Sequence, residues 1–494
     1  MKKNLLVKAS LILAAVCMVF AGTGVTAMAD TIPYDTYNYD YRDYIHYTPA
    51  AYIPAGNVNV EKYEYNGEAI GKMSDPQDLC QDDEGLIYIA DKGNNRIIVL
   101  NHEMTKVTDL ITTFDNNGSE DTFNAPYGVC VSENGQIYIA DSQNHRVVVL
   151  EKDHTLVKII DNPQSESLDD TFVFIPLKVT VDYADRVYVI AQNMFEGIMV
   201  FESTGEFSSF FGTIDVEITL WEKFWKRIAT KEERSKQKLY IPTEFTGLDI
   251  DPDGFVYATN IDSEGVQGVR RLNPRGEDVI KKGENLNVGG DLQIDGTTEY
   301  AGASQFTDVV YSGNGIYRCL DRKRGRIFTY DHEGNLLYIF GGLGSQNGTF
   351  RLPVSIEDIG GQIVVLDATL GEIVTFNITE YGQLINDAVA LRYDGDESEA
   401  VALWERVLEL DEDNELAHVG IGKAYLTSGD YKNAMKHLKL GESREYYSVA
   451  FRRYRNEILK NNASYFLTAL AVVIIAIVIF KKVRNKKKGA IADE

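Results

Sequence analysis

The sequence predicts a mainly β chain, with a six-bladed β-propeller at 56–381, a small α-helical segment at 382–460 and a single transmembrane helix at 464–480. Three observations lead to this prediction. A β-hairpin pattern returns about every 50 residues along the first part of the chain. The apolar period then lengthens from two residues to between three and four. The last apolar run is long enough to cross a bilayer.

Internal repetition is the strongest signal. Pro76 begins a segment that returns 50 residues later, and both copies contain Ile-Tyr-Ile-Ala-Asp, ending at Asp91 and Asp141. Weaker copies begin near Pro176, Pro242, Val309 and Pro353. One hairpin unit cannot bury both of its faces, whereas six units in a ring can, and few strand edges stay exposed. Six copies therefore predict six blades, and a strand near 58–65 is expected to close the ring.

The pattern Ile-Tyr-Ile-Ala-Asp-x-x-Asn-x-Arg-Ile-x-Val-Leu resembles the NHL repeat, most specifically in the first two copies. The third copy has Ala191 in place of the Asp, and the fifth has Arg324 in place of the Asn. An Asp and an Arg five residues apart flank a turn, so their charges can pair between strands. We interpret such pairs as structural clasps of the blades: Asp91 with Arg96, Asp141 with Arg146, and Asp321 with Arg326.

The segment at 382–460 has a repeat of its own, with an offset of 34 residues. Gly395-Asp396 matches Gly429-Asp430, and Ala400 matches Ala434. Apolar residues follow at i, i+3, i+4 and i+7, which is typical of amphipathic helices. The stretch from Ala424 to Ala434 resembles the tetratricopeptide (TPR) repeat. That resemblance implies binding of peptides or partner proteins, and a plain spacer is the alternative.

The N-terminus reads as a signal peptide at 1–29. Lys2, Lys3 and Lys8 form a basic start, an apolar stretch too short to span a bilayer follows, and Ala27-Met28-Ala29 offers a cleavage site. The residues at 464–480 carry no charge, and the tail at 481–494 holds six Lys or Arg. A basic flank marks the cytoplasmic side. We therefore expect a single-pass protein of the cell membrane, with its N-terminus outside and its C-terminus in the cytoplasm.

Charge is unevenly distributed along the chain. Without the three Lys of the leader and the charges of the tail, 40 basic and 72 acidic residues remain, a net charge of −32. Such a field opposes nucleic-acid binding, which depends on neutralising phosphates, so no nucleic-acid partner is expected. Cys80, Cys130 and Cys319 are too few for a disulfide framework, and the first two occupy equivalent repeat positions, as buried small residues would.

Two segments fit neither repeat. The Tyr-rich arm at 30–55 is expected to pack on the propeller, and a surface for a glycan or a partner is the alternative. An insertion at 214–241 carries an apolar helical face formed by Trp221, Phe224, Trp225 and Ile228, beside a basic polar face. Such a helix suits a lipid surface or a membrane partner, and a helix that caps the propeller is the alternative.

The sequence offers no catalytic constellation. It contains no nucleophile elbow, no phosphate loop and no His spacing typical of metal ligands. The run Asp249-Ile-Asp251-Pro-Asp253-Gly254 copies the start of a calcium loop, but Asn260 stands where the loop needs Glu. We interpret it as a hairpin turn. No catalytic, cofactor-binding or metal residue is assigned, and calcium is the one cofactor left open.

These features favour a membrane-anchored extracytoplasmic binding or scaffold protein over an enzyme. Its expected partners are proteins of the membrane, by analogy those of a transport complex. The resemblance to NHL-type and gluconolactonase-like propellers implies the alternative, a metal-dependent lactonase or related hydrolase. Acidic residues converging on the central channel would favour the hydrolase, because such chemistry needs carboxylates around a cation.

Overall fold

The computed structural model describes residues 32–163, 165, 168, 172–213, 244–261, 268–281, 288–291 and 302–492. Almost all of these belong to the second of two compact units, Met1–Pro33 and Tyr34–Glu494. The predicted signal peptide lies outside the described residues, as does the predicted insertion at 214–241.

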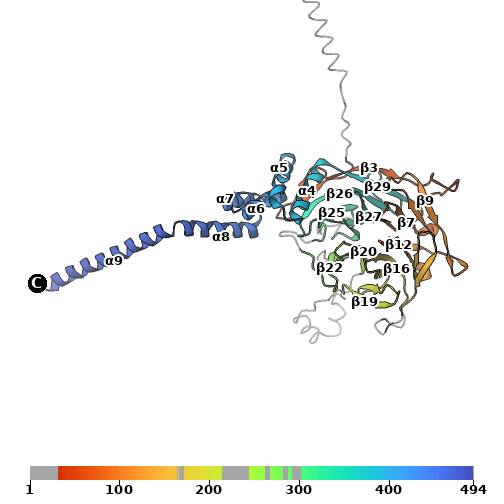
Figure 1. Ribbon diagram of the computed structural model, residues 1–494. Coiled ribbons are helices and arrows are strands. Elements are labelled where there is room, and N and C mark those ends of the chain that lie inside the picture. The colour runs from red at the N-terminus through yellow and green to blue at the C-terminus, as the bar shows by residue number, and fades with distance from the viewer. Residues whose placement is uncertain are drawn as a thin grey trace, which may run out of the picture. The chain divides into compact units, whose positions relative to one another are not determined.

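Six antiparallel sheets form the blades of a propeller, so the predicted fold class is confirmed (Figure 1). Blade one is β6 (Asp78–Gln81), β7 (Ile87–Asp91), β8 (Arg96–Leu100) and β9 (Val107–Ile111). Blade two is β12 (Pro126–Val131), β13 (Ile137–Asp141), β14 (Arg146–Leu150) and β15 (Leu156–Ile160). Blade three is β16 (Pro176–Val181), β17 (Val187–Ala191), β18 (Ile198–Phe201) and β19 (Phe207–Phe211).

The second half of the ring repeats this order. Blade four has three described strands, β20 (Phe245–Ile250), β21 (Val256–Asn260) and β22 (Val269–Leu272). Blade five is β23 (Phe306–Tyr311), β24 (Tyr317–Asp321), β25 (Arg326–Tyr330) and β26 (Leu336–Phe340). Blade six is β27 (Pro353–Ile359), β28 (Gln362–Asp367), β29 (Glu372–Ile378) and a strand from the N-terminal side, β3 (Tyr52–Val58).

The ring is closed by β3, which pairs antiparallel with β29 from Tyr52 opposite Ile378 to Val58 opposite Ile373. An N-terminal strand was expected here, but the expected position, 58–65, is wrong. Tyr52 explains the difference, because its side chain is fully buried and its ring stacks on Phe340 at 4.6 Å between centroids. β3 therefore begins at Tyr52.

Short hairpins decorate the ring. They are β1 (Tyr37–Tyr39) with β2 (Ile45–Tyr47), β4 (Glu64–Tyr65) with β5 (Glu68–Ala69), and β10 (Thr113–Asn116) with β11 (Ser119–Thr122). Single 3₁₀ turns η1 (Lys92–Asn94) and η2 (Ser142–Asn144) follow β7 and β13. The second strands of the blades are buried along their length, since both of their faces meet neighbouring blades, and this accounts for their nearly continuous apolar runs.

Six helices follow the propeller: α4 (Glu380–Tyr393), α5 (Glu397–Leu410), α6 (Glu415–Ser428), α7 (Tyr431–Leu440), α8 (Arg444–Asn461) and α9 (Ala463–Ala492). From α4 to α8, each helix packs against the next. Small residues allow this close approach: Ala400 and Ala434 are buried, and a Cβ on Gly420 would lie 2.4 Å from Nε1 of Trp404. The helical segment Ala463–Lys482 is long and apolar enough to cross a membrane.

Candidate functional site

The clasps predicted in blades one and two are ion pairs between neighbouring strands. In blade one, Asp91 accepts hydrogen bonds from Nε of Arg96 at 2.7 Å and Nδ2 of Asn94 at 2.8 Å. In blade two, Asp141 accepts them from Nε of Arg146 and Nδ2 of Asn144, both at 2.9 Å. Both carboxylates are fully buried. These side chains therefore hold the turn between the second and third strands of each of the two blades.

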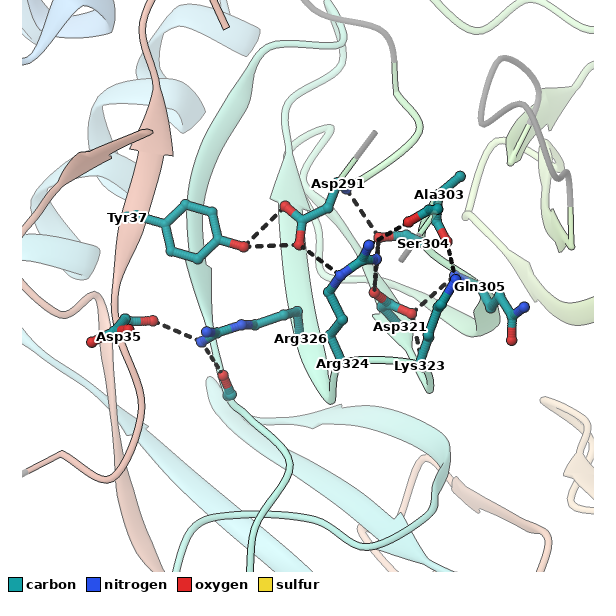
Figure 2. A network of polar contacts seen from close by, with 12 residues as sticks. Asp35, Tyr37, Asp291, Ala303, Ser304, Gln305, Asp321, Lys323, Arg324 and Arg326 are labelled. Carbon is teal, nitrogen blue, oxygen red and sulfur yellow. Dashed lines mark hydrogen bonds and ion pairs between the residues drawn. The ribbon is translucent and has the colours of Figure 1, made fainter. Parts of the chain in front are cut away.

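The pair predicted between Asp321 and Arg326 in blade five is wrong. The two residues are register partners, but Arg326 turns away and donates through Nη1 to the carbonyl oxygens of Asp35 at 2.7 Å and Gly341 at 2.6 Å (Figure 2). Arg324 is the reason, because its larger side chain replaces the Asn of the motif and its Nη1 lies 3.5 Å from Asp321. The freed Arg326 instead fastens the Tyr-rich arm.

The Asp at the end of the second strand has a further role in four blades, which the sequence did not reveal. Asp91 accepts the Ser74 N–H at 2.7 Å, Asp141 the Asn124 N–H at 2.7 Å, and Asp321 the Gln305 N–H at 2.9 Å. In blade six, Asp367 accepts the N–H groups of Arg351 and Leu352. In these four blades the Asp thus holds the chain just before the first strand. Backbone donors leave no side-chain signature, so only the structure shows this role.

The Tyr-rich arm packs on blade five, in agreement with the interpretation favoured from the sequence. Tyr37 is buried and donates its hydroxyl hydrogen bond to both oxygens of Asp291 at 2.9 Å (Figure 2). Tyr39 also donates to Asp291. Burial, together with the carboxylate, raises the pKa of both phenols, so they remain neutral donors. Tyr44 and Tyr47 stay exposed.

The first strands of the blades surround the axis of the propeller, and each contacts the first strand of the next blade. In blades two to six a β-bulge near the start of this strand is followed by one equivalent residue. A bulge re-aims the side chain that follows it. The equivalent positions hold Asp78, Gly128, Lys178, Gly247, Asp308 and Ser355.

Four of these residues form what we call the axial cluster: Asp78, Lys178, Asp308 and Ser355. Lys178 Nζ lies 2.5 Å from Asp78 Oδ1 and 3.2 Å from Asp308 Oδ2, so one ammonium joins blades one, three and five. Ser355 donates to Asp78 at 3.0 Å, and the Val129 and Ile356 N–H groups donate to the two carboxylates. All four side chains are buried. A cation of the chain itself thus occupies the point where these carboxylates converge.

The protonation of the cluster follows from burial and from its two-to-one charge ratio. Burial lowers the pKa of Lys178, but Asp308 and Asp78 outweigh it and raise that pKa above its ordinary value. Burial raises the pKa of Asp308 to about 6, although Lys178 lowers it. Lys178 therefore stays charged. Asp308, at 3.2 Å from its Nζ, is a weaker partner of the ammonium than Asp78 at 2.5 Å.

A second layer of polar residues lies two positions further along the same strands. Asp249 accepts the Tyr311 N–H at 2.6 Å, and burial raises its pKa to about 7. Burial also raises the pKa of Glu357 and of the Cys80 thiol, and Asp249 contributes to the shift at Glu357. Cys80 and Cys130, predicted to be buried, are half-buried. Within the described residues, no group of three or more His, Cys, Asp or Glu is arranged to hold a metal ion.

The calcium-like run is a hairpin turn, as interpreted. It joins β20 to β21, with the Gly254 N–H bonded to the Asp251 carbonyl at 2.9 Å. The Asp251 carboxylate accepts the N–H groups of Asp253 and Phe255 and lies 3.0 Å from Nη2 of Arg271. One carboxylate oxygen is therefore engaged by the turn and the other by Arg271 of β22.

A cavity of about 790 Å³, the junction groove, lies where the helices meet blade five and the Tyr-rich arm. Glu333 of blade five fixes this junction, because it pairs with Arg392 on α4 and lies 3.0 Å from Nζ of Lys423 on α6. Tyr338 donates to Asn386 on α4 at 2.7 Å. The walls thus come from three parts of the chain that are far apart in sequence.

The lining of the junction groove is strongly acidic. It contains two lysines, Lys281 and Lys423, against seven carboxylates: Asp40, Glu333, Glu412, Asp413, Glu415, Glu442 and Glu445. Burial, with Asp40 and Glu442 nearby, raises the pKa of Glu415 to about 7. Tyr39, Tyr41 and Tyr446 supply aromatic surface. Such a lining suits an extended segment with basic side chains.

Two sets of residues differ in how the sequence announces them. Trp221, Phe224, Trp225 and Ile228 lie outside the described residues, so the membrane or partner loop stays a prediction. Lys178 was not predicted, although a signal exists. It stands two residues after Pro176, as Asp78 and Gly128 stand after their prolines, and a lysine inside a mostly apolar inner strand is unusual.

The NHL repeat model matches residues 73–100 and 123–150, which are the first two blades, so the chain carries NHL repeats. A comparison with curated protein sequences finds no match. Among solved structures, a catalytically inactive virginiamycin B lyase from Staphylococcus aureus with quinupristin has 13% identity and a TM-score of 0.40, over 70% of this chain and 96% of that one. Hydrazine synthase of Kuenenia stuttgartiensis has 12% identity and a TM-score of 0.42, over 68% and 86%. Neither likeness carries an argument about activity.

Proposed function

We propose that this protein is a membrane-anchored extracytoplasmic scaffold whose junction groove binds a basic segment of a membrane-protein partner. The observation that carries the proposal is the groove itself, a cavity of about 790 Å³ lined by seven carboxylates, two lysines and several tyrosines. An acidic lining favours lysine and arginine side chains and speeds their encounter. Following the analogy drawn from the sequence, the partner belongs to an integral membrane complex such as a transport system.

The proposed topology rests on the two ends of the chain. The helix at Ala463–Lys482 spans the membrane, and the basic tail beyond it lies in the cytoplasm. The signal peptide at 1–29 exports the rest, so the propeller and α4–α8 lie outside. The acidic balance of the exported part supports this placement, because such a surface stays soluble.

We further assign α4–α8 to about two TPR-like units and a final helix. Consecutive packing of these helices, the offset of 34 residues and the small residues at the helix contacts support this assignment. Stacks of this kind need a cap or a neighbour. Blade five acts as that neighbour through Glu333 and Tyr338.

Photo-cross-linking in native membranes tests the proposal. A benzoyl-phenylalanine replaces Glu412, an exposed residue of the groove, and in a matched control it replaces Tyr183, an exposed residue of blade three that does not line the groove. We expect one membrane protein to be cross-linked from position 412 only. Equal patterns from both positions, or products that contain no membrane protein, would contradict the proposal.

A metal-dependent hydrolase is the second candidate, and one observation favours it. Asp78, Asp249, Asp308 and Glu357 lie on the first strands around the axis, as such chemistry requires. Lys178 weighs against it, because its ammonium takes two of these carboxylates. Calorimetric titration with calcium distinguishes the candidates: heat of binding that disappears in Asp249→Asn would favour the hydrolase, and a flat titration the scaffold.

A further inference from the structure

The C-terminal half of α8 differs from the rest of the exported part in charge. From Phe451 to Lys460 the helix carries four basic residues, Arg452, Arg453, Arg455 and Lys460, against one acid, Glu457. All five of these charged residues are exposed. The remainder of the exported part is strongly acidic. This short basic stretch lies directly before the candidate membrane span that begins at Ala463.

The same half-helix also exposes apolar side chains. Phe451, Tyr454 and Ile458 recur at i, i+3 and i+7, so they share one face of the helix. Phe451 is 48% exposed and Ile458 39% exposed. By contrast, the N-terminal half is docked, since Ala450 and Tyr446 pack with Leu438 of α7. The helix therefore has one end held by the stack and one amphipathic end without a partner in the described structure.

With α9 as the membrane span, the C-terminal end of α8 lies at the depth of the lipid headgroups. Asn462 separates the two helices with φ −110° and ψ 12°, outside the helical region. At about 1.5 Å per residue, Lys460 and Arg455 lie about 5 and 12 Å before Ala463 along the chain. The polar layer on each side of a bilayer is about 5–8 Å thick. Basic side chains on stems of this length reach its phosphates.

In the proposed topology, the positive charges at 451–460 are unfavourable unless a negatively charged partner compensates them. Positive charges on the outer side of a span oppose the orientation that the tail favours. A helix with an aromatic and aliphatic stripe beside arginines is typical of helices that lie in the membrane interface.

We propose that residues 451–460 of α8 form an interfacial helix that binds the phosphate groups of anionic phospholipids in the outer leaflet. The stripe of Phe451, Tyr454 and Ile458 enters the boundary of the acyl chains, and Arg452, Arg455 and Lys460 contact the headgroups. This contact fixes the direction in which the helical stack leaves the membrane, and with it the orientation of the junction groove. The inference rests on the proposed span of α9.

Hydrogen exchange of the full-length protein in vesicles tests this inference. One set of vesicles contains phosphatidylcholine alone, and the other contains equal parts of phosphatidylcholine and phosphatidylglycerol. At low salt we expect the amides at 451–460 to exchange about tenfold more slowly in the anionic vesicles, and the difference to shrink as salt rises. Inorganic phosphate added to the phosphatidylcholine vesicles should give no such protection, which separates lipid headgroups from free phosphate.

Two triple variants complete the test. Arg452→Ser with Arg453→Ser and Arg455→Ser should abolish the protection, whereas the matched control Lys486→Ser with Lys487→Ser and Lys488→Ser, beyond the other end of the span, should leave it intact. Equal exchange of wild type in both vesicles overturns the inference, as does loss of protection in the control. Failure of the full-length protein to float with vesicles would instead contradict the span on which the proposed function rests.

Discussion

The axis of the propeller and the junction groove both gather carboxylates, but they treat them in opposite ways. At the axis, Asp78 and Asp308 are buried and bonded to Lys178, to Ser355 and to backbone N–H groups. In the groove, Glu412 and Asp413 are exposed. A buried carboxylate needs compensation from inside the fold, whereas an exposed cluster keeps its field for a ligand. Both regions contain the same residue types. What separates the structural cluster from the candidate binding surface is whether the fold itself neutralises the carboxylates.

Removal of the ammonium at the axis should have the largest effect. Lys178→Met leaves two buried carboxylates without their cation, so we expect the free energy of unfolding to fall by about 3–5 kcal/mol. Urea denaturation of the full-length protein in detergent, followed by circular dichroism, measures it. The matched control is Lys152→Met, whose more exposed side chain pairs with Asp82 and Glu84. In the control, the free energy of unfolding should fall by less than about 1 kcal/mol. An equal fall in both variants would contradict the special importance of the buried ammonium at the axis.

The second layer at the axis should reveal itself through pH. The pKa of Asp249 is raised to about 7. Between the ordinary pKa of an Asp and about 7, the native state therefore keeps a proton that the unfolded state has released. The free energy of unfolding falls as pH rises through this range, until Asp249 is ionised in both states. We expect Asp249→Asn to gain about 4 kcal/mol over wild type at pH 8 and almost nothing at pH 4. Denaturation at both pH values measures it; a difference that does not change with pH would contradict the assignment.

In the groove, charge should govern binding while stability stays unchanged. Glu412→Lys with Asp413→Lys should weaken binding of a fluorescein-labelled peptide of alternating arginine and glycine by about tenfold at low salt. The matched control is Glu64→Lys with Glu68→Lys, the same change of charge on the exposed β4–β5 hairpin. Fluorescence anisotropy measures the affinity. Equal weakening in both double variants would mean that the peptide senses only the net charge of the protein.

The smallest effect should come from Glu415. Because burial and the nearby Asp40 and Glu442 raise its pKa to about 7, the groove gains a negative charge as pH rises from 6 to 8. Affinity for the same peptide should therefore rise about threefold over this range in wild type. In Glu415→Gln the rise should be smaller. The difference between the two proteins isolates Glu415 from His46 and His418, which also line the groove. Identical pH profiles would contradict the role given to Glu415.

Much of the fold was readable because repetition reports on it directly. The hairpin pattern gave six blades, and Asp91 with Arg96 and Asp141 with Arg146 do pair across their turns. The pair at Asp321 was wrong, because a single neighbour, Arg324, changes which partner is nearest. The closing strand was placed too late, since Tyr52 is anchored by residues about 290 positions away, such as Phe340.

The sequence by itself determined the period of the propeller, the change to helices and the apolar run at the end, because these depend on local alternation of side chains. Only the tertiary structure decided that Lys178 meets Asp78 and Asp308, and that the Tyr-rich arm, blade five and α6 enclose one groove. Those contacts join residues 100 to more than 350 positions apart. The closure of the ring brings these residues together. A short pattern of side chains depends only on neighbours in the sequence, so it cannot predict such contacts.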